Sequence, residues 1–215
     1  MLNVQKFTFN PFSENTYLVW CSETRECAVI DPGCFDENEQ LILEEYIYKN
    51  NLIVKYLINT HCHIDHVLGN NFVIDRYEPE YFIPENDLVL LEHFQRQCDS
   101  VNISADRPKL TNKFITEKLS LSVGKYPIKF LFTPGHTAGE YCLYFAAEKK
   151  CITGDVLFQN SIGRTDLWGG DYETLLSSIK DKLLTLPNDI EIYPGHGPGS
   201  TIGDEKQNNP FIKNL

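Results

Sequence analysis

The stretch that decides the fold is Thr60-His61-Cys62-His63-Ile64-Asp65-His66-Val67-Leu68-Gly69. It follows the apolar run 53–58, which is short enough for a buried strand, and it precedes residues 67–77, which can continue as a helix. The stretch is therefore predicted to lie on a strand-to-helix crossing, at the C-terminal edge of a sheet. Open α/β folds place their ligand sites at this edge.

The spacing of the polar residues indicates metal binding. His61 and His63 share a side only if the chain is extended there, because ligands on one face of a helix need a separation of three or four residues. Asp65 and His66 follow where the chain turns into the helix, so they point to a different place. A polar loop with incidental histidines is the alternative, but this dense pattern uses half of the six histidines. The spacing therefore predicts a site for two ions.

Length and composition narrow the class of protein. A chain of 215 residues is most simply a single domain over 1–215. The net charge of −11 argues against a nucleic-acid partner. The sequence has no apolar run of membrane-spanning length and no visible secretory signal. Its seven cysteines include no Cys-x-x-Cys pair, so we expect reduced thiols and a cytoplasmic location.

Periodicity and turn residues predict alternating strands and helices. The predicted strands cover residues 2–9, 15–21, 26–30, 53–58, 80–83, 126–133, 141–145, 150–153 and 190–193. The predicted helices cover residues 36–50, 86–97 and 172–186, with Asp171 as the N-cap of the last. Residues 98–116 are predicted to form an irregular connector. The first three strands suggest an antiparallel start to a sheet.

Further candidate ligands follow other predicted strands. His136 and His196 each come after a Pro-Gly turn at a strand end, and Asp155 follows Gly154 at another. Asp31 precedes a Pro-Gly turn, where it serves either as a turn residue or as a carboxylate that orients the histidine loop. His93 is interpreted as an exposed or satisfied helix residue rather than a ligand.

The order of these residues along the chain, Asp31, the cluster at 61–66, His136, Asp155 and His196, resembles that of the motifs of the metallo-β-lactamase superfamily. The resemblance extends from about residue 2 to residue 196. The resemblance implies a layered α/β fold, an αββα sandwich with the metal site at the open edge between two sheets. It implies that one ion is held by His61, His63 and His136. It implies that a second ion is held by Asp65, His66 and His196, with Asp155 bridging both. Zinc is the first expectation for these two divalent ions, with iron and manganese as alternatives.

The branch of the superfamily is indicated by a few positions. Asp155 stands where the best-known zinc β-lactamases carry cysteine, which disfavours antibiotic hydrolysis. Residues 154–158 and 161–166, with Asn15-Thr16-Tyr17, resemble short bacterial glyoxalase-II-like hydrolases, also called hydroxyacylglutathione hydrolase-like. Full-length glyoxalase II adds a C-terminal helical domain that grips glutathione, whereas 19 residues follow His196 here. We therefore expect no separate substrate domain, and the thiol carrier stays open.

The resemblance implies hydrolysis of a thioester, an S-acylglutathione or related small acyl-thiol, by a metal-bridging hydroxide. Asp155 and Asp65 are the expected catalytic residues, and Asp65 is expected to take up a proton from the attacking water. The thiolate leaves readily because the pKa of a thiol is only about 8.5. The alternatives are a persulfide dioxygenase with one iron held by His61, His136 and Asp155, and a lactone or phosphodiester hydrolase. A non-enzymatic metal-binding scaffold is disfavoured by the complete ligand set.

Two further residues, Arg164 and Cys62, each allow a functional and a purely structural interpretation. Arg164 either contacts a substrate carboxylate, or it and Asp166 stabilise their loop by pairing with each other or with the histidine loop. Cys62 lies between two candidate ligands, and an extended chain points it away from them, so we expect a packed, inert thiol.

Overall fold

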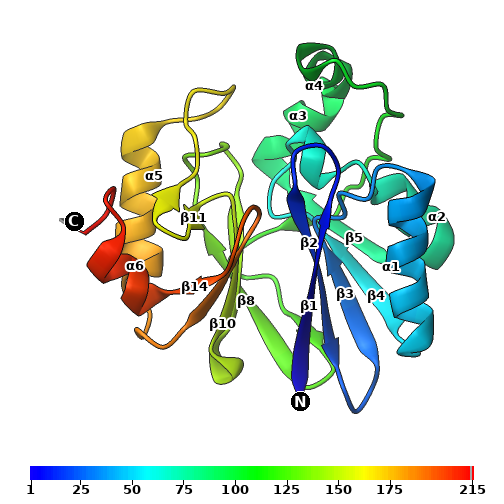
Figure 1. Ribbon diagram of the computed structural model, residues 1–215, viewed down its shortest axis with the longest axis horizontal. Coiled ribbons are helices and arrows are strands. Elements are labelled where there is room, and N and C mark those ends of the chain that lie inside the picture. The colour runs from blue at the N-terminus through cyan, green and yellow to red at the C-terminus, as the bar shows by residue number, and fades with distance from the viewer. Residues whose placement is uncertain (214) are drawn as a thin grey trace. The chain divides into compact units, whose positions relative to one another are not determined.

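The computed structural model describes residues 1–213 and 215 (Figure 1). The chain forms two compact units. The first comprises Met1–Phe114 and Ser122–Pro127, and the second comprises Ile115–Leu121 and Ile128–Leu215. The expectation that residues 1–215 form a single domain stays a prediction.

The first sheet has the strand order β1-β2-β3-β4-β5-β6. These strands are β1 (Leu2–Phe9), β2 (Glu14–Cys21), β3 (Glu26–Ile30), β4 (Ile53–Ile58), β5 (Glu80–Pro84) and β6 (Phe114–Ile115). β1, β2 and β3 pair antiparallel, which confirms the predicted start of the sheet. β3, β4 and β5 pair parallel. The residues that follow β3 and β4 therefore meet at one edge of this sheet.

Helices α1 (Glu37–Lys49), α2 (Asn70–Tyr77), α3 (Leu88–Glu92) and α4 (Phe94–Val101) belong to the first unit. Their buried side chains, including Leu43, Val73 and Phe94, share one hydrophobic core with Val29 and Leu57 of the sheet. α1 begins after Asp36, whose side chain accepts a hydrogen bond from the backbone N of Glu39 at 2.9 Å. The predicted helix over 86–97 is interrupted at His93, where φ is −103° and ψ is 23°, so it forms two short helices.

The second sheet has the strand order β14-β13-β10-β9-β8-β7. These strands are β7 (Leu121–Val123), β8 (Tyr126–Phe132), β9 (Tyr141–Phe145), β10 (Lys150–Gly154), β13 (Glu191–Pro194) and β14 (Ser200–Thr201). β9 and β10 form the predicted hairpin-like pair. β10 and β13 are parallel, with Gly154 opposite Pro194. The segments that leave these two strands therefore start side by side. A separate small hairpin is formed by β11 (Leu157–Phe158) and β12 (Ser161–Ile162).

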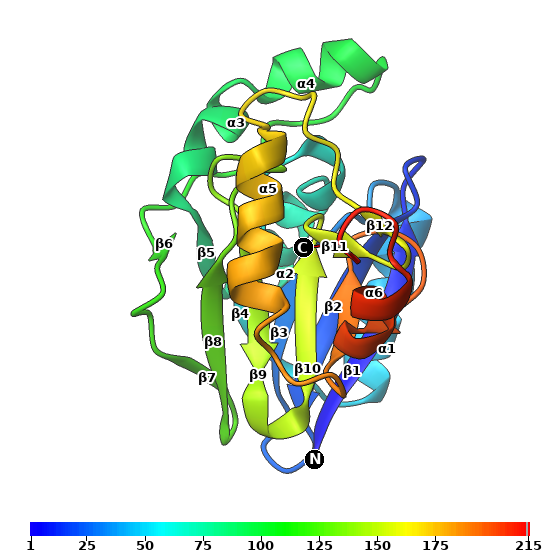
Figure 2. The same cartoon turned by 90° about the vertical axis from the view of Figure 1, so that its left-hand side faces the viewer.

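Helices α5 (Tyr172–Ser178) and α6 (Ile202–Asn208) cover one face of the second sheet (Figure 2). Leu175 and Ile202 of these helices share a core with Cys151 and Ile192 of the sheet. Asp171 caps α5 as predicted, because its Oδ1 accepts a hydrogen bond from the backbone N of Thr174 at 2.8 Å. The helix continues as a π-helical turn over Ile179–Leu183, within the predicted range 172–186.

The two sheets, each flanked by helices, confirm the predicted mixed α/β class. All seven cysteines are buried free thiols, as their pattern predicted. Within the described part of the chain, no helix is both long and apolar enough to cross a membrane.

Candidate metal centre

The histidine loop follows β4 in the first unit. His61 and His66 are fully buried, His63 is almost buried, and the short 3₁₀ turn Ile64–His66 carries Asp65 and His66. The rings of His63 and His66 both lie beside that of His61, with centroid separations of 4.9 and 4.1 Å. The four predicted ligands of this loop therefore include three imidazoles gathered in one place.

Asp31 orients this loop. It follows β3 with a positive φ of 49°, and its side chain is buried. Its Oδ1 accepts a hydrogen bond from the backbone N of Thr60 at 2.7 Å. Its Oδ2 accepts hydrogen bonds from Thr60 Oγ1 at 2.6 Å and from His66 Nδ1 at 3.2 Å. The second interpretation of Asp31, a carboxylate that orients the histidine loop, is confirmed.

These hydrogen bonds also determine which ring nitrogen carries the proton. Because the Thr60 hydroxyl donates to Asp31, it acts as the acceptor for His61 Nδ1, which lies 3.1 Å from Thr60 Oγ1. His66 Nδ1 donates directly to the same carboxylate. Both imidazoles then keep their hydrogen on Nδ1, and the lone pair on Nε2 is the one that can bind a metal ion.

Two residues that sequence reasoning missed hold the backbone of the loop. Gln97 on α4 accepts a hydrogen bond from the backbone N of Ile64 at 3.0 Å and donates to the backbone O of Cys62 at 3.3 Å. Asp87, which is 1% exposed, accepts a hydrogen bond from the backbone N of Cys62 at 3.2 Å. No spacing pattern could have found them, because their partners lie 25 to 35 residues away along the chain.

Glu14 is a buried carboxylate behind the same loop, and it was also missed. Its Oε2 accepts a hydrogen bond from Thr16 Oγ1 at 2.9 Å, and its Oε1 lies 4.0 Å from His66 Nδ1. Burial raises the pKa of Glu14 well above its usual value. Gly33 allows this approach, because a Cβ there would lie 2.0 Å from Glu14 Oε2 and 2.8 Å from the backbone O of Asp65, which cannot move aside as a side chain can. The Asp-Pro-Gly turn therefore needs its glycine.

In the second unit, His136, Asp155 and His196 come together. Asp155 Oδ2 lies 3.5 Å from His136 Nε2 and 3.6 Å from His196 Nε2. His136 Nδ1 donates a hydrogen bond to the backbone O of Arg164 at 2.7 Å, which again leaves Nε2 as the ligand atom. Imidazole nitrogens beside a carboxylate oxygen form a donor set that suits zinc, iron or manganese.

Backbone contacts place Asp155 beside these histidines. The backbone N of Gly195 donates to the backbone O of Gly154 at 2.7 Å, extending the pairing of β10 and β13 toward His196. Glu140, which is buried and was not predicted, accepts a hydrogen bond from the backbone N of Asp155 at 2.6 Å. A Cβ on Gly163 would lie 1.8 Å from the backbone O of Asp155, so only glycine fits there.

The side-chain contacts of Arg164 support one of its two interpretations. Its Nε and Nη2 donate to the two carboxylate oxygens of Asp166 at 2.7 and 2.8 Å, which favours the pairing of these two residues with each other. The hydrogen bonds from Arg164 lower the pKa of Asp166 to about 2.

The expectations for Cys62 and His93 are also confirmed. Cys62 is fully buried, and burial raises the pKa of its thiol well above the usual value, as expected of an inert residue. His93 Nδ1 donates to the backbone O of Val89 at 3.0 Å, so the ring is hydrogen-bonded as expected, although the residue lies between α3 and α4 rather than inside a helix.

Comparison with known proteins gives the family. The family model described as the metallo-beta-lactamase superfamily matches residues 9–196. The chain belongs to this superfamily. Hydroxyacylglutathione hydrolase GloC of Haemophilus influenzae is 39% identical and aligns with 98% of both chains. The probable metallo-hydrolase YqgX of Bacillus subtilis is 32% identical, over 97% of this chain and 96% of that protein.

Solved structures confirm the predicted metallo-β-lactamase fold. BLEG-1, described as a B3 metallo-beta-lactamase, superposes with a TM-score of 0.88 at 30% identity, over 98% of this chain and 99% of that one. TTHA1623 in a di-iron-bound form superposes with a TM-score of 0.86 at 32% identity, over 97% and 100% of the two chains. Family, fold and donor chemistry together assign a metal-dependent hydrolase with a divalent metal site.

Proposed function

We propose that this protein is a metal-dependent thioester hydrolase that cleaves an S-acylglutathione or a related small acyl-thiol. The observation that carries the proposal is its similarity to a hydroxyacylglutathione hydrolase over 98% of both chains. The segments at 154–158 and 161–166 add to this support, because they resemble the same group of hydrolases. Asp155 lies beside the histidines at the position where the best-known zinc β-lactamases carry cysteine. This difference further supports the glyoxalase-II-like branch.

The proposed metal centre uses seven residues and two divalent ions. One ion is assigned to His61, His63 and His136. The second is assigned to Asp65, His66 and His196, with Asp155 shared by both. The hydrogen bonds at Nδ1 of His61, His66 and His136 support this proposal, because they leave Nε2 of each ring as the ligand atom. Zinc is proposed first, and iron or manganese are the alternatives, since TTHA1623 has a di-iron form.

Such ions would supply a nucleophilic hydroxide at neutral pH, by lowering the pKa of water from 15.7 to about 7, and would polarise the substrate carbonyl. The residues of the chain orient the imidazoles and accept the proton. Asp31 holds the imidazole of His66 directly and that of His61 through the Thr60 hydroxyl. The carboxylate of Asp65, 3.7 Å from His66 Nε2, is proposed to take up the proton of the attacking water. No general acid is needed for a thiolate leaving group, whose conjugate thiol has a pKa of about 8.5.

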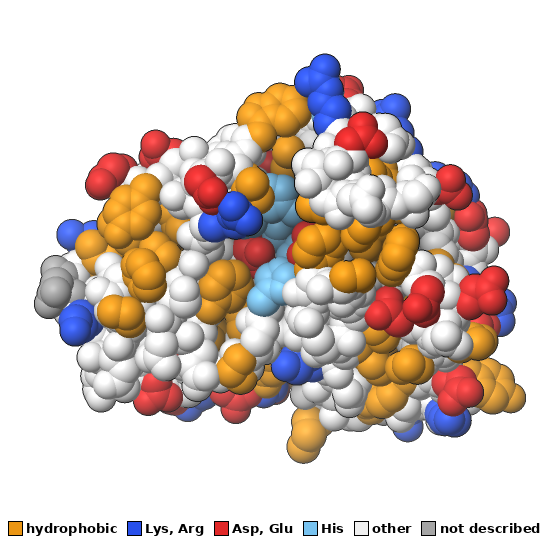
Figure 3. All heavy atoms as spheres, turned by 45° about the horizontal axis from the view of Figure 1, so that its top comes forward, with side chains coloured by type: hydrophobic (Ala, Val, Ile, Leu, Met, Phe, Trp, Pro, Cys, Tyr) orange, Lys and Arg blue, Asp and Glu red, His pale blue; other side chains and the backbone are white. Residues whose placement is uncertain are grey.

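The proposed partner is a small molecule and the proposed location is the cytoplasm. The net charge of −11 supports a partner other than nucleic acid. On the face drawn in Figure 3, lysine and arginine side chains are scattered among acidic ones. Buried free thiols at all seven cysteines support a reducing compartment.

Asp155→Ala tests this function. The wild-type protein loaded with zinc should release thiol from a glutathione thioester without consuming oxygen. The variant should bind fewer metal equivalents and lose turnover by about 100-fold or more, because it lacks the shared carboxylate. Asp189→Ala is the matched control, because this exposed carboxylate pairs with Lys149 and should leave metal binding and turnover unchanged.

A variant with near-wild-type rate and two bound metals would refute the assignment of Asp155. Oxygen uptake with a glutathione persulfide would instead favour the dioxygenase alternative. Cleavage of a lactone, phosphodiester or β-lactam, with the thioester left intact, would refute the proposed substrate class.

A further inference from the structure

A buried carboxylate in the second unit, Glu205 on α6, takes no part in the proposed chemistry. Its side chain is 1% exposed. Its Oε2 accepts hydrogen bonds from the backbone N of Asn160 and from Asn209 Nδ2, both at 2.8 Å. Its Oε1 accepts a hydrogen bond from Ser200 Oγ. A buried carboxylate is costly unless it is fully hydrogen-bonded, so these donors must stay in place around it.

The first segment held in this way is the small hairpin of β11 and β12. Asn160 lies in its turn with a φ of 57°, and Asn209 Nδ2 also donates to the backbone O of Ser161 at 2.9 Å. The hairpin starts two residues after Asp155. It is followed by Gly163, which lies against the backbone O of Asp155.

The same hairpin leads to His136. Arg164 comes two residues after β12, and its backbone O accepts the hydrogen bond from His136 Nδ1 at 2.7 Å. The position of the hairpin therefore affects both the Asp155 carboxylate and the orientation of the His136 ring.

The second segment held by Glu205 carries His196. Ser200 belongs to β14 and pairs with Ile192 of β13. Between β13 and β14, the chain makes the loop that contains His196. The hydrogen bond from Ser200 to Glu205 therefore fixes the C-terminal end of this loop, where the chain enters β14.

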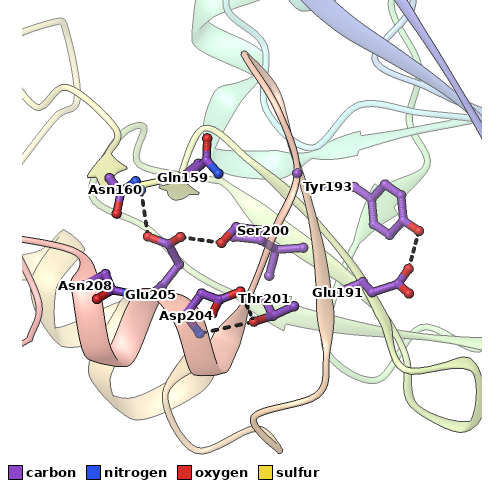
Figure 4. Close-up of a pocket in the computed structure, with 11 residues that line it drawn as sticks. Gln159, Asn160, Glu191, Tyr193, Ser200, Thr201, Asp204, Glu205 and Asn208 are labelled. Atoms are coloured by element: carbon purple, nitrogen blue, oxygen red, sulfur yellow. Dashed lines mark hydrogen bonds between the residues drawn. The ribbon is translucent and has the colours of Figure 1, made fainter.

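Glu205, Asn160 and Ser200 line a common cleft of about 490 Å³ in the second unit. Figure 4 shows the Glu205 carboxylate between Asn160 on one side and Ser200 on the other. We propose that Glu205 is a positioning residue that ties the hairpin after Asp155 to the loop carrying His196. It thereby sets the separations of 3.5 and 3.6 Å between Asp155 Oδ2 and the two Nε2 atoms. This inference rests on the proposed function only in taking these three residues as metal ligands.

Two substitutions of Glu205 distinguish a role in positioning the proposed ligands from a general effect on the stability of the fold. Glu205→Ala removes all three acceptor contacts. Glu205→Gln can keep them, because its amide oxygen can accept from Asn160 and Asn209. Its NH₂ group can then donate to the Ser200 hydroxyl, which accepts as well as donates. Asn208→Ala is the matched control, because Asn208 is exposed, lies on the same helix and lines the same cleft.

The measurement is the titration of the metal-free full chain with Co²⁺, followed by visible absorption and by competition with a chelator, without substrate. Glu205→Ala should weaken binding by about 10-fold, the lower end of the range for residues that hydrogen-bond a ligand directly, and should change the absorption spectrum. Glu205→Gln and Asn208→Ala should keep the wild-type spectrum and bind within about threefold of wild type, the range typical of minor substitutions.

A folded Glu205→Ala protein with wild-type affinity and spectrum would overturn the inference, and so would a Gln variant as impaired as the Ala variant. If the Ala variant does not fold, Ser200→Ala removes only one contact, and an unchanged Co²⁺ spectrum in that variant would also overturn it. A wild-type protein that binds Co²⁺ but leaves thioesters intact would refute the proposed function and leave this inference standing.

Discussion

Replacing Asp31 with asparagine is expected to weaken metal binding while leaving the fold intact. The carboxylate accepts three hydrogen bonds, two from Thr60 and one from His66 Nδ1. The backbone N of Thr60 can only donate, so the amide oxygen of the introduced side chain must face it. The amide NH₂ then faces the Thr60 hydroxyl and His66 Nδ1, which become acceptors. The hydroxyl in turn donates to His61 Nδ1, and both imidazoles are driven to carry their hydrogen on Nε2.

The size of the effect follows from the hydrogen bonds that are lost. A hydrogen bond to a charged acceptor contributes about 1.5–3 kcal/mol. A tenfold change in an equilibrium corresponds to about 1.36 kcal/mol, so forcing His66 back to the binding tautomer costs roughly 10- to 100-fold in affinity. His61 donates to the neutral Thr60 hydroxyl, a hydrogen bond that contributes about 0.5–1.5 kcal/mol, so its cost is roughly 2- to 10-fold. The loss of a hydrogen-bond partner behind a metal-bound histidine has the same typical size, about 10- to 100-fold. The predicted weakening is therefore one to two orders of magnitude for the ion proposed at His66, and up to about one order of magnitude for the ion proposed at His61.

The assay is competition for zinc between the protein and a chromophoric chelator, with thermal unfolding of the metal-free protein measured in parallel. Asp36→Asn is the matched control, because it makes the same chemical change at the N-cap of α1, where Asn caps as well as Asp. The control should bind zinc as the wild type does. If the Asp31→Asn protein also bound zinc within about threefold of wild type, well short of the 10- to 100-fold loss, the proposed control of the tautomers would be refuted.

The remaining predictions concern Gln97 and the ion pair between Arg164 and Asp166. Gln97→Ala should lower the free energy of unfolding by about 1–3 kcal/mol and speed zinc release, because the histidine loop loses two hydrogen bonds. Gln95→Ala on the same helix should change neither, and equal zinc-release rates for the two variants would contradict the expected role of Gln97. The pKa of Asp166 is lowered from 3.8 to about 2, so its ion pair is fully present above pH 4 and is lost as the pH falls through 2. Arg164→Ala should return this pKa toward 3.8 in an NMR titration of the carboxyl carbon, and an unchanged pKa would show that Arg164 does not cause the shift.

Local sequence patterns determined most of the secondary structure. The strands at Leu2–Phe9, Glu26–Ile30 and Ile53–Ile58 begin and end where their apolar residues and turns predicted. The interruption at His93 was missed, because the stretch around it reads as one continuous helix, and the π-helical turn after Ser178 was also not predicted. Motif order alone also indicated the family, which the match over residues 9–196 then confirmed.

The sequence predicted the candidate metal ligands but not the residues that orient them. Residues that carry imidazole or carboxylate at strand ends could be named, because their types and spacing reflect the chemistry of metal binding. The groups that orient them could not be named. Gln97 and Glu140 contribute through hydrogen bonds to backbone atoms 15 to 35 residues away.

Asp31 and Glu205 show most clearly why the sequence could not reveal the residues that orient the candidate ligands. A carboxylate accepts hydrogen bonds from whichever donors the fold brings within about 3 Å, and many of those donors are backbone groups that every residue type supplies. The sequence thus determined the secondary structure and the residues able to bind a metal. Only the tertiary structure decided which nitrogen of each ring carries the proton and which buried carboxylates hold the loops in place.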